Sequence, residues 1–150
     1  ELRDLGGAVT AETSGGDIEG DNLRGAVDAR TSAGDVELEN VAAPITARTS
    51  VGDVEVEITA TSFSTDPAIQ LRTSHGDIEL TLPPDLQASI RAKVEGYGGM
   101  SSDEEIRSDV PLTREGGDGE PLRATGDMNG GGPAIELETS GGSIRIEHGQ

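Results

Sequence analysis

Hydrophobic and polar residues alternate with a period of two along most of the chain, which is the pattern of β-strands that bury one face. Before the Val51-Gly52 pair, every second residue from Ile45 to Thr49 is apolar or threonine. After that pair, Val54 to Ile58 follow the same alternation. The pattern predicts a repeating unit of strand, tight turn and strand, with one apolar face.

The turn of this unit carries a short phrase, Thr-Ser-x-Gly-Asp followed by Val or Ile, that recurs along the chain. Copies open at Thr13, Thr31, Thr49 and Thr73, and the variant Thr-Ser-Gly-Gly-Ser-Ile opens at Thr139. The first three copies are evenly spaced (31 − 13 = 18 and 49 − 31 = 18). A fixed period near twenty residues indicates stacked structural units.

One such unit cannot bury its own apolar face, so we expect neighbouring copies to bury it, with Val27 beside Val9 and Ile45. The predicted fold is therefore all-β: a single-stranded parallel β-helix, or β-solenoid, with rungs of about 18 residues built from two or three short strands. Antiparallel hairpins stacked into a sandwich would show the same alternation and are the alternative fold.

The repeat is interrupted between its fourth and fifth copies. Residues 86–94 alternate as another strand that lacks the turn phrase, and the alternation then fails. We expect a long hairpin-like excursion near residues 96–132, in which Leu112 and Leu122 each anchor a short strand. A Gly-rich segment then leads into the last rung.

Composition agrees with a thin interior, since 150 residues include one Tyr, one Phe and no Trp. The 22 glycines gather at the turns and in the excursion, where we expect positive φ. Residues 1–150 are predicted to form one domain. The chain starts with Glu1 in place of Met, and the alternation of a rung is already present from Leu5. We therefore expect a fragment of a longer exported protein whose signal or anchor is missing.

The repeated turns at residues 31–36, 49–54 and 73–78, with the closing stretch Gly130–Gly142, resemble a bacterial family of β-strand-repeat proteins that are labelled adhesins and related to the toastrack group. In that family a Gly-Gly-Gly-Pro-like entry into a final strand and turn closes the domain. Here Ser143 replaces the last Asp. The resemblance implies a β-helical, exported or surface-exposed module and brings no established catalytic residues.

The aspartates of the phrase are the candidate metal ligands. They are Asp17, Asp35, Asp53 and Asp77. Stacked rungs would place them about 4.8 Å apart, where a cation such as Ca²⁺ could bridge their carboxylates. The favoured interpretation is instead that each carboxylate accepts hydrogen bonds from backbone N–H groups of its own turn. No other cofactor is expected.

The threonines of the phrase would form a second ladder, which could present hydroxyls to ice or sugar if it faced outward. Their phase favours burial, with each hydroxyl satisfied by the adjoining turn and the neighbouring Ser facing outward. Two charged rows are expected on the outer surface, Arg30, Arg48 and Arg72 before the turn and Glu37, Glu55 and Glu79 after it. We expect ion pairs across the turn to soften the repulsion within each row.

Catalysis is not expected. Ser74, His75 and Asp77 have the residue types of a nucleophile, a base and an orienting group, but neighbours in one tight turn rarely point as such a set requires. A β-helix enzyme acting on acidic polysaccharides is the enzymatic alternative, although Lys93 is the only lysine available to hold such a substrate.

The net charge of −18 argues against nucleic acid and anionic membranes as partners. No apolar run is long enough to insert in a membrane. The partners that remain possible are a surface glycan, another protein, or a second copy of the chain that pairs through the solenoid ends. Salt adaptation is a competing origin of the acidity; it predicts a melting temperature that climbs with KCl, and a flat response would exclude it.

We therefore expect a non-enzymatic, extracytoplasmic β-solenoid module of the cell surface, acting as an adhesin or envelope scaffold. An envelope regulatory or sensory domain, tethered to a membrane segment absent from this sequence, is the alternative.

Overall fold

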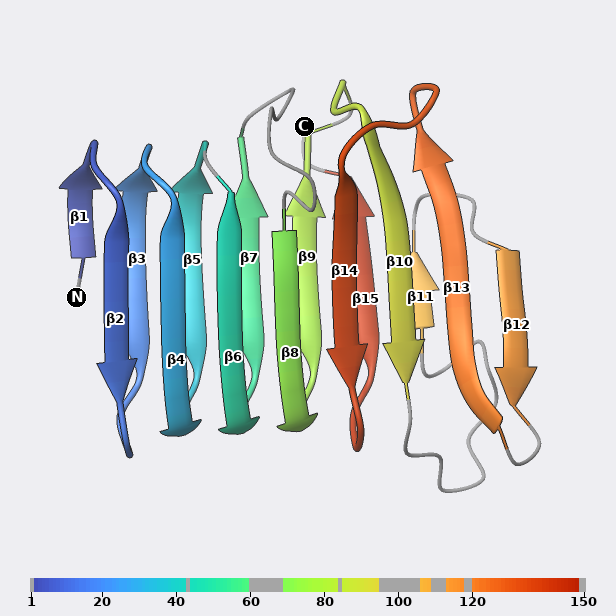
Figure 1. Cartoon of the computed structure of the whole chain (residues 1–150), viewed down its shortest axis with the longest axis horizontal. Helices are drawn as coiled ribbons and strands as arrows, with labels where there is room; N and C mark the ends of the chain where they lie inside the picture. Colours follow the sequence, from blue (N-terminus) through green and yellow to red (C-terminus); the bar gives the residue numbers. More distant parts are fainter. Residues whose placement is uncertain are drawn as a thin grey trace.

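The structure is a computed structural model that describes residues 2–42, 44–59, 69–83, 85–94, 106–108, 113–117 and 120–148. Its regular elements in these ranges are all β-strands, arranged as two sheets that lie face to face (Figure 1). A search of the same ranges finds no helix with the length and apolar character needed to cross a membrane.

Seven strands form sheet A and eight form sheet B. Across sheet A the order is β1 (Leu2–Leu5), β3 (Ile18–Leu23), β5 (Val36–Val41), β7 (Val54–Ile58), β9 (Ile78–Leu82), β15 (Ile144–His148) and β11 (Ile106–Ser108). Across sheet B it is β2 (Val9–Thr13), β4 (Val27–Ala33), β6 (Ile45–Val51), β8 (Ile69–His75), β14 (Ala134–Thr139), β10 (Ala88–Val94), β13 (Glu120–Met128) and β12 (Thr113–Gly117).

Each repeat contributes one strand to each sheet, so that a rung is a strand of sheet B, the turn phrase and a strand of sheet A. Equivalent strands of successive rungs pair in parallel and in register, with Val27 opposite Val9 on one side and Ile45 on the other. The predicted parallel β-solenoid is confirmed, with two strands per rung. Stacked hairpins are excluded because the two strands of a unit belong to different sheets.

The fifth copy of the phrase lies beside the fourth, although 66 residues separate them (139 − 73). Thr139 pairs with Thr73 and Ile144 pairs with Ile78. The earlier strands β10 and β11 pair with the far side of β14 and β15 (Figure 1). The rung β14–β15 is therefore inserted into the stack between β8–β9 and β10–β11.

The predicted excursion contains a hairpin, as expected, but this hairpin continues sheet B. Strands β12 and β13 pair antiparallel, and β13 also pairs antiparallel with β10. Strand β11 crosses to sheet A, where Ile106 is fully buried. Leu122 lies in β13 as predicted, and Leu112 lies outside the described residues.

The core between the sheets is aliphatic, as the composition predicts. The largest fully buried side chains are leucines and isoleucines, among them Leu38, Ile69, Leu71 and Ile78. Each rung covers the apolar face of the next, so burial is shared along the stack. Phe63 and Tyr97 lie outside the described residues.

Candidate functional site

The threonine of the turn phrase joins each rung to its neighbour. Thr49 Oγ1 donates a hydrogen bond of 3.0 Å to the carbonyl of Gly34 in the neighbouring rung. Equivalent bonds of 2.9–3.1 Å form from Thr31, Thr73 and Thr139. These four threonines are at most 6% exposed, which confirms the buried ladder from Thr31 to Thr139 and excludes them as an outward hydroxyl array. Thr13, in the first rung, is only partly buried.

The glycine of the phrase is required by the close approach of two turns. A Cβ at Gly34, Gly76 or Gly142 would collide with the glycine carbonyl of the neighbouring rung. The expectation of positive φ is confirmed in the excursion at Gly130 and Gly131. It is wrong for most of the turn phrase, because Gly52 is the phrase's only described glycine with positive φ. Glycine is needed at this position because the carbonyl of the neighbouring turn leaves no room for a Cβ.

The aspartates of the phrase form hydrogen bonds between rungs. One carboxylate oxygen of Asp35 accepts the backbone N–H of Asp53 at 2.9 Å, and Asp17 and Asp53 bond in the same way to the next aspartate. The expectation that each carboxylate serves its own turn is therefore wrong. Parallel stacking brings the amide of the next rung directly to the oxygen.

Ser143 ends this ladder in place of an aspartate. Its backbone N–H and its hydroxyl both donate to Asp77 Oδ1, at 2.9 and 3.2 Å. Asp77 is thus engaged by the last rung instead of by His75, and Ser74 and His75 are both exposed at the turn. The structure does not assemble these three residues into a nucleophile and base pair.

The four aspartates stay close to one another without forming a compact metal cage. Across the described ranges, no group of three or more His, Asp or Glu side chains is placed to hold a metal ion. Ca²⁺ binding at Asp17, Asp35, Asp53 and Asp77 stays the less favoured interpretation of this ladder.

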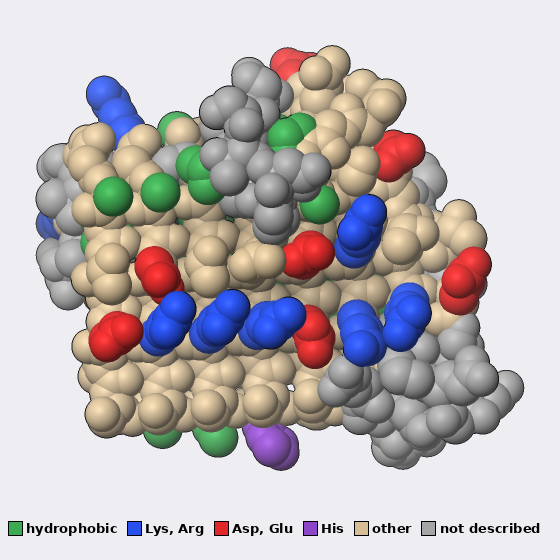
Figure 2. All heavy atoms as spheres, in the orientation of Figure 1, with side chains coloured by type: hydrophobic (Ala, Val, Ile, Leu, Met, Phe, Trp, Pro, Cys, Tyr) green, Lys and Arg blue, Asp and Glu red, His purple; other side chains and the backbone are tan. Residues whose placement is uncertain are grey.

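One row of charged side chains crosses the outer face of sheet B from edge to edge. In spatial order its members are Glu12, Arg30, Arg48, Arg72, Glu138, Lys93, Arg123 and Glu115. We call this the sheet B row. It holds five of the 11 basic residues of the chain, and Figure 2 shows its Lys and Arg side chains in a line across the face.

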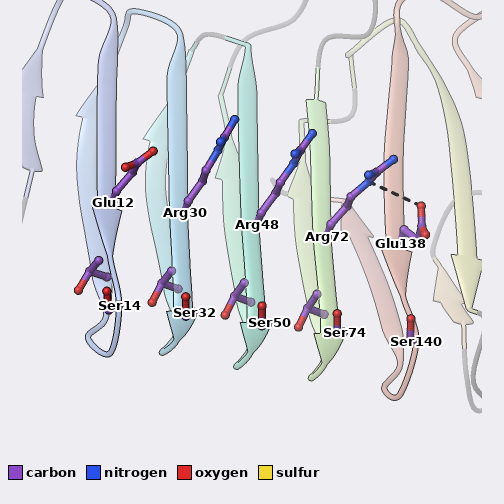
Figure 3. A pocket seen from close by; sticks show the side chains of 14 residues that line it. Glu12, Ser14, Arg30, Ser32, Arg48, Ser50, Arg72, Ser74, Glu138 and Ser140 are labelled. Atoms are coloured by element: carbon purple, nitrogen blue, oxygen red, sulfur yellow. Dashed lines mark ion pairs between the residues drawn. The ribbon is translucent and has the colours of Figure 1, made fainter.

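A row of serines runs beside the arginines, nearer the turns (Figure 3). Its members are Ser14, Ser32, Ser50, Ser74 and Ser140. Together with the first five members of the sheet B row, Glu12 to Glu138, these serines line an open groove of about 710 Å³, which the threonines of the phrase also line. A smaller hollow of about 300 Å³ continues over β10 and β13.

Ion pairs of the sheet B row form within its own face. Arg72 Nε lies 3.6 Å from Glu138 Oε2 on the next strand, as Figure 3 shows, and Arg30 Nε lies 3.2 Å from Asp28 Oδ1 on the same strand. The predicted pairing of arginines with glutamates across the turn is wrong. Arg30 and Glu37 flank one turn, but their strands belong to different sheets and their side chains leave opposite faces.

The outer face of sheet A carries a second charged row. In spatial order its members are Glu19, Glu37, Glu55, Glu79, Arg145 and Arg107. We call this the sheet A row. Partial burial raises the pKa of Glu55, and repulsion from Glu79, Glu37 and other nearby glutamates adds to this rise. Four glutamates on adjacent strands thus form the most crowded negative surface of the two rows.

Sequence reasoning found the first three arginines of the sheet B row but missed its extension to Glu138, Lys93 and Arg123. The alternation in residues 88–94 already placed Lys93 on the outward face. Its alignment with Arg72 could not be predicted, because that alignment depends on the insertion of β14 between β8 and β10.

Comparison with known proteins gives one match. The family model described as Toastrack DUF4097 matches residues 6–147, which include every copy of the turn phrase. Neither the curated proteins nor the solved structures contain a match to the chain.

Proposed function

The chain belongs to the Toastrack DUF4097 family, and we propose that it is a non-enzymatic, extracytoplasmic module that binds a surface partner, as an adhesin or as an envelope scaffold. The binding surface is the outer face of sheet B. Its partner is a glycan or a protein that lies along the sheet B row.

The sheet B row is the observation that carries this proposal. In a chain with a net charge of −18, three arginines stand on adjacent strands beside a row of serine hydroxyls. Guanidinium groups and hydroxyls together supply many hydrogen-bond donors and several acceptors. Because paired strands hold them in line, little conformational freedom is lost when an extended partner binds. The groove is open, which suits an extended partner better than a small enclosed substrate.

Glycan-array and cell-binding assays test the proposal. The wild-type chain should bind, and Arg48→Ser should weaken binding by removing the central guanidinium of the groove. Arg145→Ser is the matched control, since Arg145 is an exposed arginine on the opposite face. If the wild-type chain binds nothing in either assay, the result would count against an adhesive role. If the two variants lose the same amount of binding, the result would count against the outer face of sheet B as the binding surface.

A further inference from the structure

We propose that copies of this chain stack face to face, with the sheet B row of one copy against the sheet A row of the next. This self-association goes beyond the proposed function and uses the same sheet B row, so a surface partner bound along that row would compete with it. It rests on the pattern of charge along the two rows, taken rung by rung.

The signs of the two rows are opposite in four consecutive rungs. From β4–β5 to β14–β15, the sheet B row presents Arg30, Arg48, Arg72 and Glu138. Over the same rungs, the sheet A row presents Glu37, Glu55, Glu79 and Arg145. The inversion includes the last rung, where the acidic and basic members exchange places. This exchange distinguishes a matched pair of rows from a uniformly basic row and a uniformly acidic row.

The spacing of the two rows also matches. Both rows are built on the same rungs, so both repeat at the separation of paired strands, about 4.8 Å. Arg30 lies four residues before Gly34 and Glu37 lies three residues after it, which places the rows at similar heights above the turn. A single translation of one copy, with the stack axes kept parallel, therefore brings all four pairs together.

Contact between the rows would reduce the repulsion between like charges that each separate copy contains. The glutamates of the sheet A row repel one another, and this repulsion contributes to the raised pKa of Glu55. An arginine row laid over them replaces that repulsion with charge-assisted hydrogen bonds, for which the planar guanidinium is suited.

The same comparison limits the contact to those four rungs. In the first rung Glu12 would face Glu19, and beyond the inserted rung Lys93 would face Arg107, so both ends carry like charges. Each copy also has a net charge of −18. Salt at about 0.15 M screens that long-range repulsion beyond roughly 8 Å, whereas pairs in contact are screened much less.

The proposed interface joins two different faces, so each copy keeps one unused face. Interfaces of this kind do not close on themselves when the relation between copies is a translation, and they generate open stacks. The expected species are a series of oligomers that grow with concentration, and not a closed dimer.

Sedimentation velocity over a range of concentrations tests the proposal. In about 0.15 M NaCl the weight-average sedimentation coefficient should rise with concentration. In about 1 M NaCl it should fall toward the monomer value, because the screening length of about 3 Å then reaches the distance between the paired charges themselves. Arg48→Glu and Glu55→Arg should each weaken association by about tenfold or more, because each turns one attractive pair into a repulsive one. Arg91→Glu is the control, since it makes the same charge change as Arg48→Glu on an exposed sheet B residue outside the row.

An equal mixture of the two row variants provides the decisive measurement. The sheet B row of Arg48→Glu carries a glutamate opposite the new arginine in the sheet A row of Glu55→Arg. The sheet B row of Glu55→Arg and the sheet A row of Arg48→Glu are both wild-type and still match. Mixing should therefore restore association that neither variant shows alone. If either variant melts abnormally, Arg30→Glu and Glu37→Arg repeat the design one rung away.

Three results would overturn the proposal. The first is a wild-type chain that stays monomeric at every concentration in about 0.15 M NaCl. The second is association that survives both single reversals, which would assign it to the solenoid ends. The third is a monomeric chain that binds polygalacturonate through Arg48, which would assign the sheet B row to an anionic glycan.

Discussion

Replacing Gly142 with alanine would place a methyl group against the backbone of the neighbouring rung. The new Cβ would collide with the carbonyl oxygen of Gly76 and lie 2.9 Å from Asp77 Oδ1. The first oxygen accepts the hydroxyl of Thr139 and the second accepts the amide of Ser143, each at 2.9 Å. Because the main obstruction is backbone, the turn must move away, and both hydrogen bonds must lengthen.

The cost follows from two contributions. Forcing an extra methyl group into a packed site costs about 1–3 kcal/mol. Thr139 is fully buried, so leaving its hydroxyl without a partner costs about 1–3 kcal/mol more. We expect Gly142→Ala to lower the free energy of unfolding by about 4 kcal/mol, a large part of the roughly 5–15 kcal/mol that stabilises a typical protein. For a chain of this length, that corresponds to a decrease of about 8–16 °C in the melting temperature.

Gly141→Ala is the matched control, one residue away in the same turn. Its Cβ would lie 3.4 Å from the carbonyl oxygen of Ser74, near ordinary contact distance. Other rungs already carry Ala33, Val51 or His75 at this slot. Thermal melts followed by circular dichroism should show a change within about 0.5 kcal/mol for the control. Equal melting temperatures for the two variants would refute the argument that close approach, and not backbone freedom, requires the glycine.

Three further predictions concern the ladders and the charged rows. Thr49→Val should lower the free energy of unfolding in urea by about 1–3 kcal/mol, because the carbonyl of Gly34 loses its hydrogen-bond donor. Ser50→Ala, which changes an exposed neighbour, should leave this free energy unchanged, and equal effects of the two variants would contradict the hydrogen bond between rungs. The folded-state pKa of Glu55 is raised, so its ionised form destabilises the fold, and stability is lost as pH rises from 4.5 through that raised pKa. Glu55→Gln should therefore melt at a higher temperature than the wild-type chain at neutral pH, and this difference should disappear below pH 4.5. A difference that grows on acidification would contradict the raised pKa of Glu55. For the aspartate ladder, CaCl2 should raise the melting temperature no more than NaCl of equal ionic strength, and saturable binding heat that Asp53→Asn weakens would instead establish a Ca²⁺ site.

Much of the fold could be predicted from local pattern. A period of two assigns each side chain to one face of a strand, which is why the burial of Thr31 and the exposure of Ser32 were both predictable. The recurrence of the phrase also favoured a parallel register, because identical rungs stack best when equivalent residues lie opposite one another, but the same alternation fitted stacked antiparallel hairpins. The charged triplet Arg30, Arg48 and Arg72 followed from the same reasoning.

Several functional features depend on contacts that local pattern does not contain. The sequence placed Asp35 at a turn, but only the stack shows that its carboxylate serves Asp53. It placed Arg30 and Glu37 near one turn, but only the two-sheet arrangement shows that they leave opposite faces.

Periodicity within about 18 residues is enough to assign the strands, the turns and the inward and outward residues. Four features are known only from the tertiary structure: the parallel stacking of the rungs, their order, the insertion of β14–β15, and the continuous row from Arg72 through Glu138 to Lys93. The physical reason is that alternation specifies which face a side chain takes. Which strand lies beside it is decided by hydrogen bonds and buried contacts between segments far apart in the chain.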